Sequence, residues 1–159
     1  MRKTDLAYAA GIVDGEGCIG LYLQTTQKSK PSYKMGVRVS NTNEWLLQWL
    51  KFAFGGSVCV QRVSSVEKAK NYKPQWQWAI ITTRALVFLK LIYPYLRLKK
   101  PQAEIAITFQ QVRRGRGHYL TDEERAVAEA QRIVMANLNK RGTVKIKSDV
   151  GEQTAPMRQ

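Results

Sequence analysis

The stretch YAAGIVDGEGCIGLY at residues 8–22 changes from a helical to an extended pattern within a few residues. Upstream, Thr4 or Asp5 can serve as the N-cap of a helix of small residues that ends at the glycines at positions 15 and 17. Downstream, CIGLYLQTTQ alternates apolar and polar residues with the period of two that is typical of a half-buried strand. The sequence therefore predicts a short helix that leads directly into the first strand of a sheet.

The chain then repeats this order of elements. YKMGVRVSNT alternates again, so it is predicted to form a hairpin with the first strand across the loop QKSKPS. A helix over residues 41–54 has apolar residues at helical spacing, namely Trp45, Leu46, Trp49, Leu50 and Ala53. A second hairpin is formed by SVCVQRVSS and PQWQWAIIT, which VEKAKNYK joins. Further helices are predicted over residues 84–93, 101–114 and 121–140.

This order predicts an α+β fold, with the helices grouped on one face of an antiparallel sheet and the other face left free. A chain of 159 residues is expected to form one domain, placed at residues 1–141. Thr121 and Glu124 make a capping box for the last helix. Residues 142–159 have little apolar content and are predicted to form a flexible C-terminal tail.

The chain is strongly basic. Its 26 lysines and arginines against 12 acidic residues give a formal charge of +14, and the pI is near 10.0. This excess of positive charge favours a phosphate-rich partner, with nucleic acid first. No apolar run approaches the ~20 residues of a membrane-spanning helix, and the N-terminus lacks the apolar core of a signal peptide. We therefore expect an intracellular protein, in the cytoplasm of a prokaryote or in an organelle, that is not secreted and has no membrane partner.

Cysteine and histidine are scarce. Cys18 and Cys59 each lie in a strand-like alternation without a second Cys or His at metal-ligand spacing, so both are predicted to be free thiols. His118 is the single histidine and lies in the loop-like segment RRGRGHY. This composition argues against zinc fingers, His-Asn-His nucleases and Ser-His triads.

The free face of the predicted sheet carries polar and basic side chains with almost no acids. Glutamine, arginine and lysine can hydrogen-bond base edges in a DNA major groove, which is wide enough for a two-stranded ribbon. The alternative is an ordinary solvated sheet face. The basic character favours DNA, and the residues predicted to contact it are Tyr22, Gln24, Thr26, Lys28, Lys34, Arg38, Gln61, Arg62, Gln75 and Gln77.

Several segments resemble the LAGLIDADG homing endonuclease family in the expected order. AAGIVDGEG stands where that family has its name motif. Later segments are similar as well, namely RVSNTNEWLLQWLKFAFGG at 38–56, WQW at 76–78 and FLKLIYPYLRLKKPQAEI at 88–105. The resemblance extends from residue 5 to residue 110 and implies an αββαββα core, in which an antiparallel β-sheet saddle has helices packed on one face.

The resemblance implies a site-specific endonuclease that makes a metal-dependent double-strand break in a long, near-palindromic DNA target. By the same resemblance, the cut leaves short 3′ overhangs and the gene lies in an intron or intein. The chain carries one copy of the motif, so two copies are expected to meet as a homodimer through the first helix. The residues assigned to the dimer interface are Ala7, Ala10, Gly11 and Asp14, and the resemblance also makes Asp14 part of the structure of the helix end.

Glu16, the last acid of the motif, is implied to bind the divalent metal, at a position where many family members have Asp. The glycines allow a backbone carbonyl, that of Gly15, to approach the same ion. Such hard oxygen ligands favour Mg²⁺ or Mn²⁺ over zinc. The ion stabilises charge on the attacking water and on the leaving oxygen at phosphorus.

Two further residues are assigned to catalysis by resemblance. Lys99 matches a family position near the reacting phosphate, where a lysine stabilises developing negative charge, and Lys100 is an alternative for this role. Asn41 lies where relatives carry a polar residue of the metal-bound water network, but Asn41 or Thr42 could equally be the N-cap of the next helix. Arg97 and Lys100 otherwise hold DNA phosphates, which supply affinity without sequence information.

A second class of function stays open at this point. A non-cleaving nucleic-acid binder, such as an intron maturase or a regulator, could use the same fold, and a nickase is a third alternative. A maturase or regulator can lose the metal-binding acid, whereas this chain keeps Glu16. The carboxylate therefore favours the endonuclease.

Overall fold

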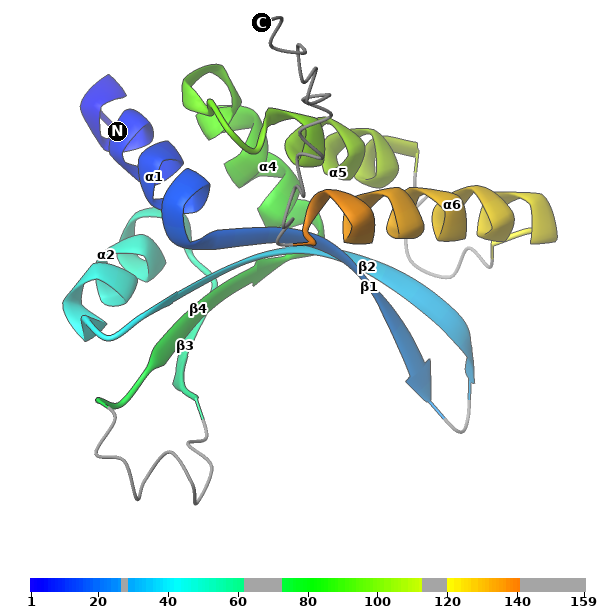
Figure 1. Ribbon diagram of the computed structural model, residues 1–159, viewed down its shortest axis with the longest axis horizontal. Coiled ribbons are helices and arrows are strands. Elements are labelled where there is room, and N and C mark those ends of the chain that lie inside the picture. Colours follow the sequence, from blue (N-terminus) through cyan, green and yellow to red (C-terminus); the bar gives the residue numbers. More distant parts are fainter. Residues whose placement is uncertain (27–28, 62–72, 113–119, 141–159) are drawn as a thin grey trace, which may run out of the picture.

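The computed structural model describes residues 1–26, 29–61, 73–112 and 120–140 (Figure 1). Its elements are, in chain order, α1 (Lys3–Glu16), β1 (Gly17–Thr26), β2 (Ser29–Asn41), α2 (Glu44–Phe54), β3 (Ser57–Val60), β4 (Trp76–Ile81), α4 (Thr82–Ile92), the 3₁₀ turn η1 (Tyr93–Tyr95), α5 (Lys100–Val112) and α6 (Asp122–Leu138). The predicted order of helix, hairpin, helix, hairpin and helices is confirmed.

The strands form a four-stranded antiparallel sheet in the order β1-β2-β4-β3. Gly17 of β1 lies opposite Val39 of β2, and Gly36 of β2 lies opposite Ile81 of β4. The helices α1, α2, α4, α5 and α6 lie on the same side of this sheet, and the sheet curves away beneath them (Figure 1). The predicted α+β class, with helices on one face, is confirmed.

The core lies between the sheet and the helices. Alternate strand residues point into it, and the fully buried ones are Ile19, Met35, Val37, Val39 and Trp78. Trp78 donates a hydrogen bond from Nε1 to the carbonyl oxygen of Gly55 at 2.8 Å, just after α2. Its ring also meets Phe88 of α4 edge to face, with centroids 5.2 Å apart. Trp78 therefore joins the second hairpin to two helices.

The beginnings of the first two helices differ from the prediction. Neither Thr4 nor Asp5 caps α1, because the helix begins at Lys3 and the Asp5 carboxylate accepts from the backbone N–H of Arg2 at 3.2 Å. The second helix begins at Glu44 rather than at residue 41, since β2 continues to residue 41. Trp45, one of the apolar residues at helical spacing, is 70% exposed.

The last helix begins as predicted. The Thr121 hydroxyl accepts from the backbone N–H of Glu124 at 3.2 Å, and the Glu124 carboxylate accepts from the backbone N–H of Thr121 at 3.0 Å. Within the described residues, no helix has both the length and the apolar character needed to cross a membrane. The predicted tail, 142–159, and His118 lie outside the described residues, so the division of the chain at residue 141 stays a prediction.

Candidate active site and nucleic-acid interface

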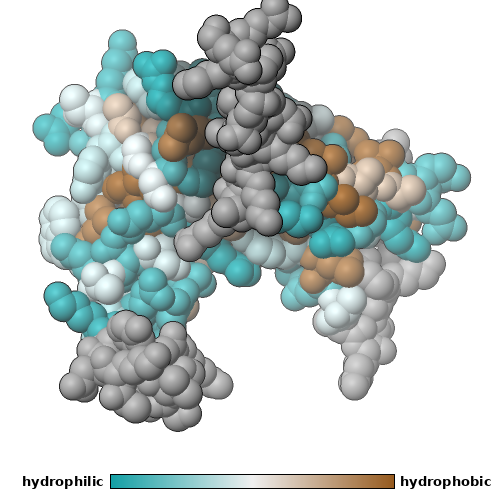
Figure 2. All heavy atoms as spheres, viewed as in Figure 1, coloured by the Kyte–Doolittle hydropathy of each residue, from teal (hydrophilic) through white to brown (hydrophobic). Residues whose placement is uncertain are grey.

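The face of the sheet opposite the helices, called the concave face below, is built from alternate strand residues. Tyr22 lies opposite Lys34 in the β1–β2 ladder, and Gln24 lies opposite Ser32. Arg38 is on the same face, because directly opposed and alternate residues of a pleated sheet share a side. In Figure 2 the arch of the sheet leaves a hollow below the molecule, whose visible rim includes many hydrophilic residues. The structure thus brings these four sequence-predicted polar residues, Tyr22, Gln24, Lys34 and Arg38, together.

The β3–β4 half of the concave face carries glutamines that share one hydroxyl. Gln77 lies opposite Ser40 of β2 and Cys59 of β3. The side-chain amides of Gln61 and Gln77 both donate to Ser40 Oγ, at 3.1 and 3.3 Å. Gln75 lies at the exposed end of this half, where its carbonyl accepts from the backbone N–H of Gln61 at 2.7 Å. Ser40 was missed from the sequence, although the alternation through positions 34, 36 and 38 reaches it.

Three predicted contacts cannot be placed. The β1–β2 register shifts beyond Gln24, so that Thr26 lies opposite Ser29, and the side chain of Thr26 is outside the described part of the molecule. Lys28 and Arg62 lie outside the described residues altogether. Their assignment to DNA binding stays a prediction.

Gly17 fixes how the chain passes from α1 into β1. Its backbone N–H bonds to the carbonyl oxygen of Val13, the last bond of the helix. A Cβ atom on Gly17 would lie 2.6 Å from that oxygen and 2.7 Å from Val13 Cα, both of them backbone atoms that cannot move aside. Only glycine therefore permits this tight junction, which sets Glu16 at the end of the helix.

Glu16 is exposed at that end and has a polar neighbour in Asn41. The side-chain amide of Asn41 donates to a Glu16 carboxylate oxygen. The amide oxygen of Asn41 accepts from the backbone N–H of Asn43 at 2.7 Å, which orients the amide. Asn43, rather than Asn41 or Thr42, is the N-cap of α2. The pairing of Asn41 with Glu16 places both of these predicted catalytic residues in one site.

Asp14 binds the backbone of residues 97–99 to the same end of α1. Its carboxylate accepts from the backbone N–H groups of Arg97 and Lys99, at 2.7 and 2.9 Å. The Lys99 side chain in turn donates to the backbone carbonyl oxygen of Asp14. Lys99 therefore contacts α1 at Asp14, two residues before Glu16, and the Asp14 carboxylate is engaged within its own chain. Glu16 is the motif acid whose carboxylate is exposed.

The two predicted phosphate anchors lie differently. Arg97 is exposed, although its backbone is fixed by Asp14. Lys100 is half-buried, and its Nζ lies 5.7 Å from the centroid of the Tyr93 ring. Lys100 thus has a cation–π contact among the helices, so that its role toward DNA stays a prediction.

The outer face of α1 carries small residues. Ala7, Gly11 and Gly15 are exposed, and a Cβ atom on either glycine would meet nothing within 4 Å. Ala10, which was assigned to the dimer interface, is fully buried in the core of its own chain and offers no surface to a partner. That part of the assignment is wrong, because Ala10 lies with Ala9 and Val13 on the side of α1 that packs against the core.

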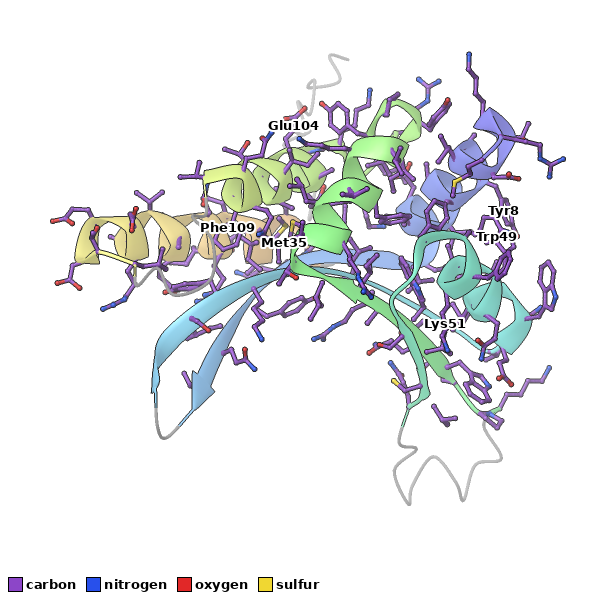
Figure 3. All side chains as sticks on the ribbon, turned by 180° about the vertical axis from the view of Figure 1, so that it is seen from behind. Tyr8, Met35, Trp49, Lys51, Glu104 and Phe109 are labelled. Carbon is purple, nitrogen blue, oxygen red and sulfur yellow. The ribbon has the colours of Figure 1, made fainter. Side chains whose placement is uncertain are left out.

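An aromatic cluster, Tyr8, Trp45, Trp49 and Phe52, adjoins this face and was missed from the sequence. Trp49 is half-buried, and the other three are exposed. Tyr8 is on α1, and its ring meets Trp49 of α2 with centroids 5.3 Å apart (Figure 3). Trp45, Trp49 and Phe52 are spaced at i, i+4 and i+7, which places them on one face of α2. The exposed fractions are 53% for Tyr8, 70% for Trp45 and 93% for Phe52. The same spacing in the sequence could have identified an apolar stripe on α2.

Within the described part of the chain, no group of three or more His, Cys, Asp or Glu side chains could hold a metal ion. One chain supplies Glu16, with the Gly15 carbonyl in the last helical turn, where carbonyls lack intrahelical donors. The described residues thus offer part of a metal centre at this place, and a complete one would need further oxygen ligands, such as those of a second chain, water or a phosphate.

Comparisons with known proteins identify solved structures that share this fold. No protein-family model matches the chain, and no curated protein matches its sequence. The homing endonuclease I-CvuI, in complex with DNA, is 17% identical and superposes with a TM-score of 0.70 over 89% of this chain and 85% of its own. The archaeal intron-encoded homing endonuclease I-Vdi141I, also complexed with DNA, gives 12% identity and 0.70 over 89% and 88%.

The LAGLIDADG homing endonuclease I-SmaMI, bound to cleaved DNA, is 15% identical and gives a TM-score of 0.67 over 85% of this chain but only 45% of its own. These likenesses confirm that the chain has the LAGLIDADG homing endonuclease fold. The resemblance seen in the sequence is thereby confirmed at the level of the fold.

Proposed function

We propose that the chain is a homodimeric, divalent-metal-dependent DNA endonuclease that makes a site-specific double-strand break in a long, near-palindromic target. The observation that carries this proposal is the constellation at the end of α1. There Glu16 is exposed and Asn41 donates to it, while Lys99 is fixed by Asp14, two residues before Glu16. Carboxylate, amide and amine groups at one point next to a basic sheet face suit phosphodiester hydrolysis.

The concave face supports DNA as the partner. Its side chains include Arg38, Lys34 and Gln77, which offer hydrogen-bond donors to base edges. The formal charge of +14 supplies the electrostatic attraction to phosphates. I-CvuI, I-Vdi141I and I-SmaMI are each described with DNA. A DNA substrate is consistent with the expected intracellular compartment, the cytoplasm of a prokaryote or an organelle.

Several features support a homodimer. The chain covers 85% of I-CvuI and 88% of I-Vdi141I but only 45% of I-SmaMI. Two copies of this chain would therefore match about the whole length of I-SmaMI. The exposed face of α1 around Gly11 lets another backbone approach closely, and the aromatic cluster beside it offers apolar surface. A two-fold axis along α1 would bring the two Glu16 side chains near each other and near both strands of one duplex.

The residues at the helix end fit a hard divalent cation. Glu16 presents a carboxylate, and Gly15 presents a backbone carbonyl in the last turn, which are oxygen ligands of the kind that Mg²⁺ and Mn²⁺ prefer. A bound ion would supply Lewis-acid stabilisation of negative charge at the reacting phosphate. I-CvuI was studied with 2 mM Mg in one structure and 2 mM Ca in another.

The chain's own residues have separate tasks in this proposal. Asn41 orients the Glu16 carboxylate through its amide, and the backbone N–H of Asn43 orients that amide. The Lys99 ammonium, placed by the carbonyl of Asp14, stabilises the charge that develops on phosphorus-bound oxygens when water attacks and one P–O bond breaks. Asp14 is a positioning residue, since its carboxylate holds the 97–99 backbone rather than the substrate.

The alternative is a non-cleaving nucleic-acid binder on the same fold. Such a protein needs the concave face but not the carboxylate, so the Glu16–Asn41 pair would have no task in it. The pair therefore favours the endonuclease.

The proposal is tested by cleavage of the host gene in the form that lacks the intron or intein expected to carry the gene of this protein. Duplex DNA that spans this locus is incubated with the protein in Mg²⁺ and, in parallel, in Ca²⁺. We expect a double-strand break at one site in Mg²⁺ and binding without cleavage in Ca²⁺. Binding at one site with both strands intact in Mg²⁺ and in Mn²⁺ would favour the non-cleaving binder.

A further inference from the structure

Two opposed glycines leave part of the concave face without side chains. Gly20 of β1 lies directly opposite Gly36 of β2. A Cβ atom on Gly20 would lie 2.7 Å from Tyr22 Oη and 2.8 Å from Tyr22 Cζ. A Cβ atom on Gly36 would lie 3.3 Å from Tyr22 Cε2. The absence of side chains at both positions therefore allows the Tyr22 ring to lie down over the strands instead of standing out from the sheet.

Arg38 covers the other side of this ring. It lies two residues beyond Gly36 on β2 and faces the same side of the sheet. Its Cζ is 4.1 Å from the centroid of the Tyr22 ring, well within the range of a cation–π contact. The ring is thus enclosed between the glycine pair and the guanidinium, and Arg38 itself stays exposed toward the hollow of the sheet.

Within the described part of the chain the Tyr22 hydroxyl makes no hydrogen bond of normal geometry, and the Cys18 side chain is its polar neighbour. Burial, with the neighbouring Cys18 as a smaller cause, raises the pKa of Tyr22 to about 12, so the phenol is uncharged at neutral pH. A buried hydroxyl without a hydrogen bond of normal geometry adds little stabilisation. The contact with Arg38 is therefore made by the ring and not by the hydroxyl.

We propose that Tyr22 is a positioning residue that holds the Arg38 guanidinium to read a guanine in the major groove, and so sets the base preference at one position of each half-site. The inference rests on the proposed function, because it needs DNA against the concave face. A guanidinium offers parallel N–H donors that match O6 and N7 of guanine. A stacked arginine has already lost part of the side-chain freedom that binding would otherwise remove.

Four substitutions separate the parts of this arrangement. Tyr22→Phe keeps the ring and removes the hydroxyl, whereas Tyr22→Leu removes the ring. Gly20→Ala places a methyl group where Tyr22 Oη and Cζ lie and displaces the ring without deleting it. Arg38→Ala removes the guanidinium that is proposed to bind guanine. Gln24→Ala is the matched control, because Gln24 is exposed on the same strand and is outside the stack.

Proton NMR of the free protein tests the stack without any DNA. Ring current should shift the side-chain Hδ resonances of Arg38 upfield in the wild type and in Tyr22→Phe. The shift should be lost in Tyr22→Leu and in Gly20→Ala, with circular dichroism confirming that both variants fold. Unshifted Arg38 resonances in the wild type would overturn the inference.

Binding selection tests the reading of DNA. The probe is a library of palindromic duplexes with randomised half-sites, selected in Ca²⁺. Arg38→Ala should reduce the preference for guanine at one position by about 5- to 150-fold. Tyr22→Leu and Gly20→Ala should reduce it at the same position by about 2- to 30-fold, the range of a cation–π contact. Tyr22→Phe should match the wild type, and Gln24→Ala should affect a different position.

Several outcomes would overturn the inference. Tyr22→Leu could change a different base pair, or weaken binding further in an Arg38→Ala background, and either result would mean that Tyr22 contacts DNA itself. A Tyr22→Phe variant as impaired as Tyr22→Leu would give the role to the hydroxyl. A wild type that shows the ring-current shift but binds no duplex would overturn the proposed function as well, whereas binding with unchanged preferences in these variants would overturn this inference alone.

Discussion

Gly11→Ala is expected to act in opposite directions on the single chain and on the dimer. Gly11 is exposed inside α1, and a Cβ atom on it would meet no atom within 4 Å. In a helix interior alanine is more favourable than glycine by about 0.8–1.0 kcal/mol. The substitution should therefore raise the Tm of the monomeric chain by about 2–4 °C.

The dimer should respond in the reverse sense. If two α1 helices pack side by side through Ala7, Gly11 and Gly15, the substitution adds two methyl groups at their closest approach. Overpacking of this kind costs about 1–3 kcal/mol, which corresponds to about 5- to 150-fold weaker association. Free space around Gly11 in one chain thus becomes a steric conflict between two.

Sedimentation equilibrium over a range of concentrations measures the association constant, and thermal unfolding at low concentration measures the Tm. Thr108→Ala is the matched control, because Thr108 is exposed on α5 and its replacement also favours helix without changing α1. A Gly11→Ala protein with a raised Tm and undiminished association would refute the assignment of this face to the dimer.

Three further substitutions test the local structure. Asp14→Ala removes the acceptor of two backbone N–H groups, at 2.7 and 2.9 Å, and should lower the free energy of unfolding in urea by about 1.5–3 kcal/mol, whereas Asp14→Asn should lose less. Gly17→Ala sets a Cβ atom 2.6 Å from Val13 O and should destabilise by about 1–3 kcal/mol in the same assay, an expectation that an unchanged urea midpoint contradicts. Hydrogen bonds from the Arg132 guanidinium and, to a lesser extent, from the Tyr33 hydroxyl lower the pKa of Glu129 from 4.5 to about 2. Between pH 2 and 4.5 the folded state therefore binds fewer protons than the unfolded state. The stabilisation of the folded state by Glu129 is present above pH 4.5 and is lost as the pH falls toward 2. Glu129→Gln should flatten the dependence of Tm on pH there, and an unaltered slope would show that other groups cause it.

The faces of the strands could be predicted from the sequence because each face meets a different environment. Apolar side chains at alternate positions of β1 and β2 face the helices, and the polar ones between them face away. The capping box of α6 could be predicted for a similar reason, since Thr121 and Glu124 are three residues apart and satisfy each other locally.

Contacts between distant segments could not be predicted from the residues alone. Asp14 bonds to backbone groups 83 and 85 residues away, and Gln77 reaches Ser40 across 37 residues, so these bonds depend on how the elements pack. Ala10 was misplaced because α1 consists of small residues on both faces, which gives little contrast between inside and outside. The N-cap of α2 moved to Asn43 because Asn41 is paired in β2 and donates to Glu16.

Cleavage by a Glu16 variant shows whether Glu16 is the acid of a DNA-cleaving site. Wild type and Glu16→Gln are bound to equal extents to a target duplex labelled on both strands, and strand breaks are counted in Mg²⁺. Glutamine keeps the size of the side chain and an oxygen that can accept from Asn41, but it removes the negative charge that a metal ion needs. We expect the wild type to break both strands and Glu16→Gln to bind the duplex and break neither. Equal cleavage by the two proteins would contradict the assignment.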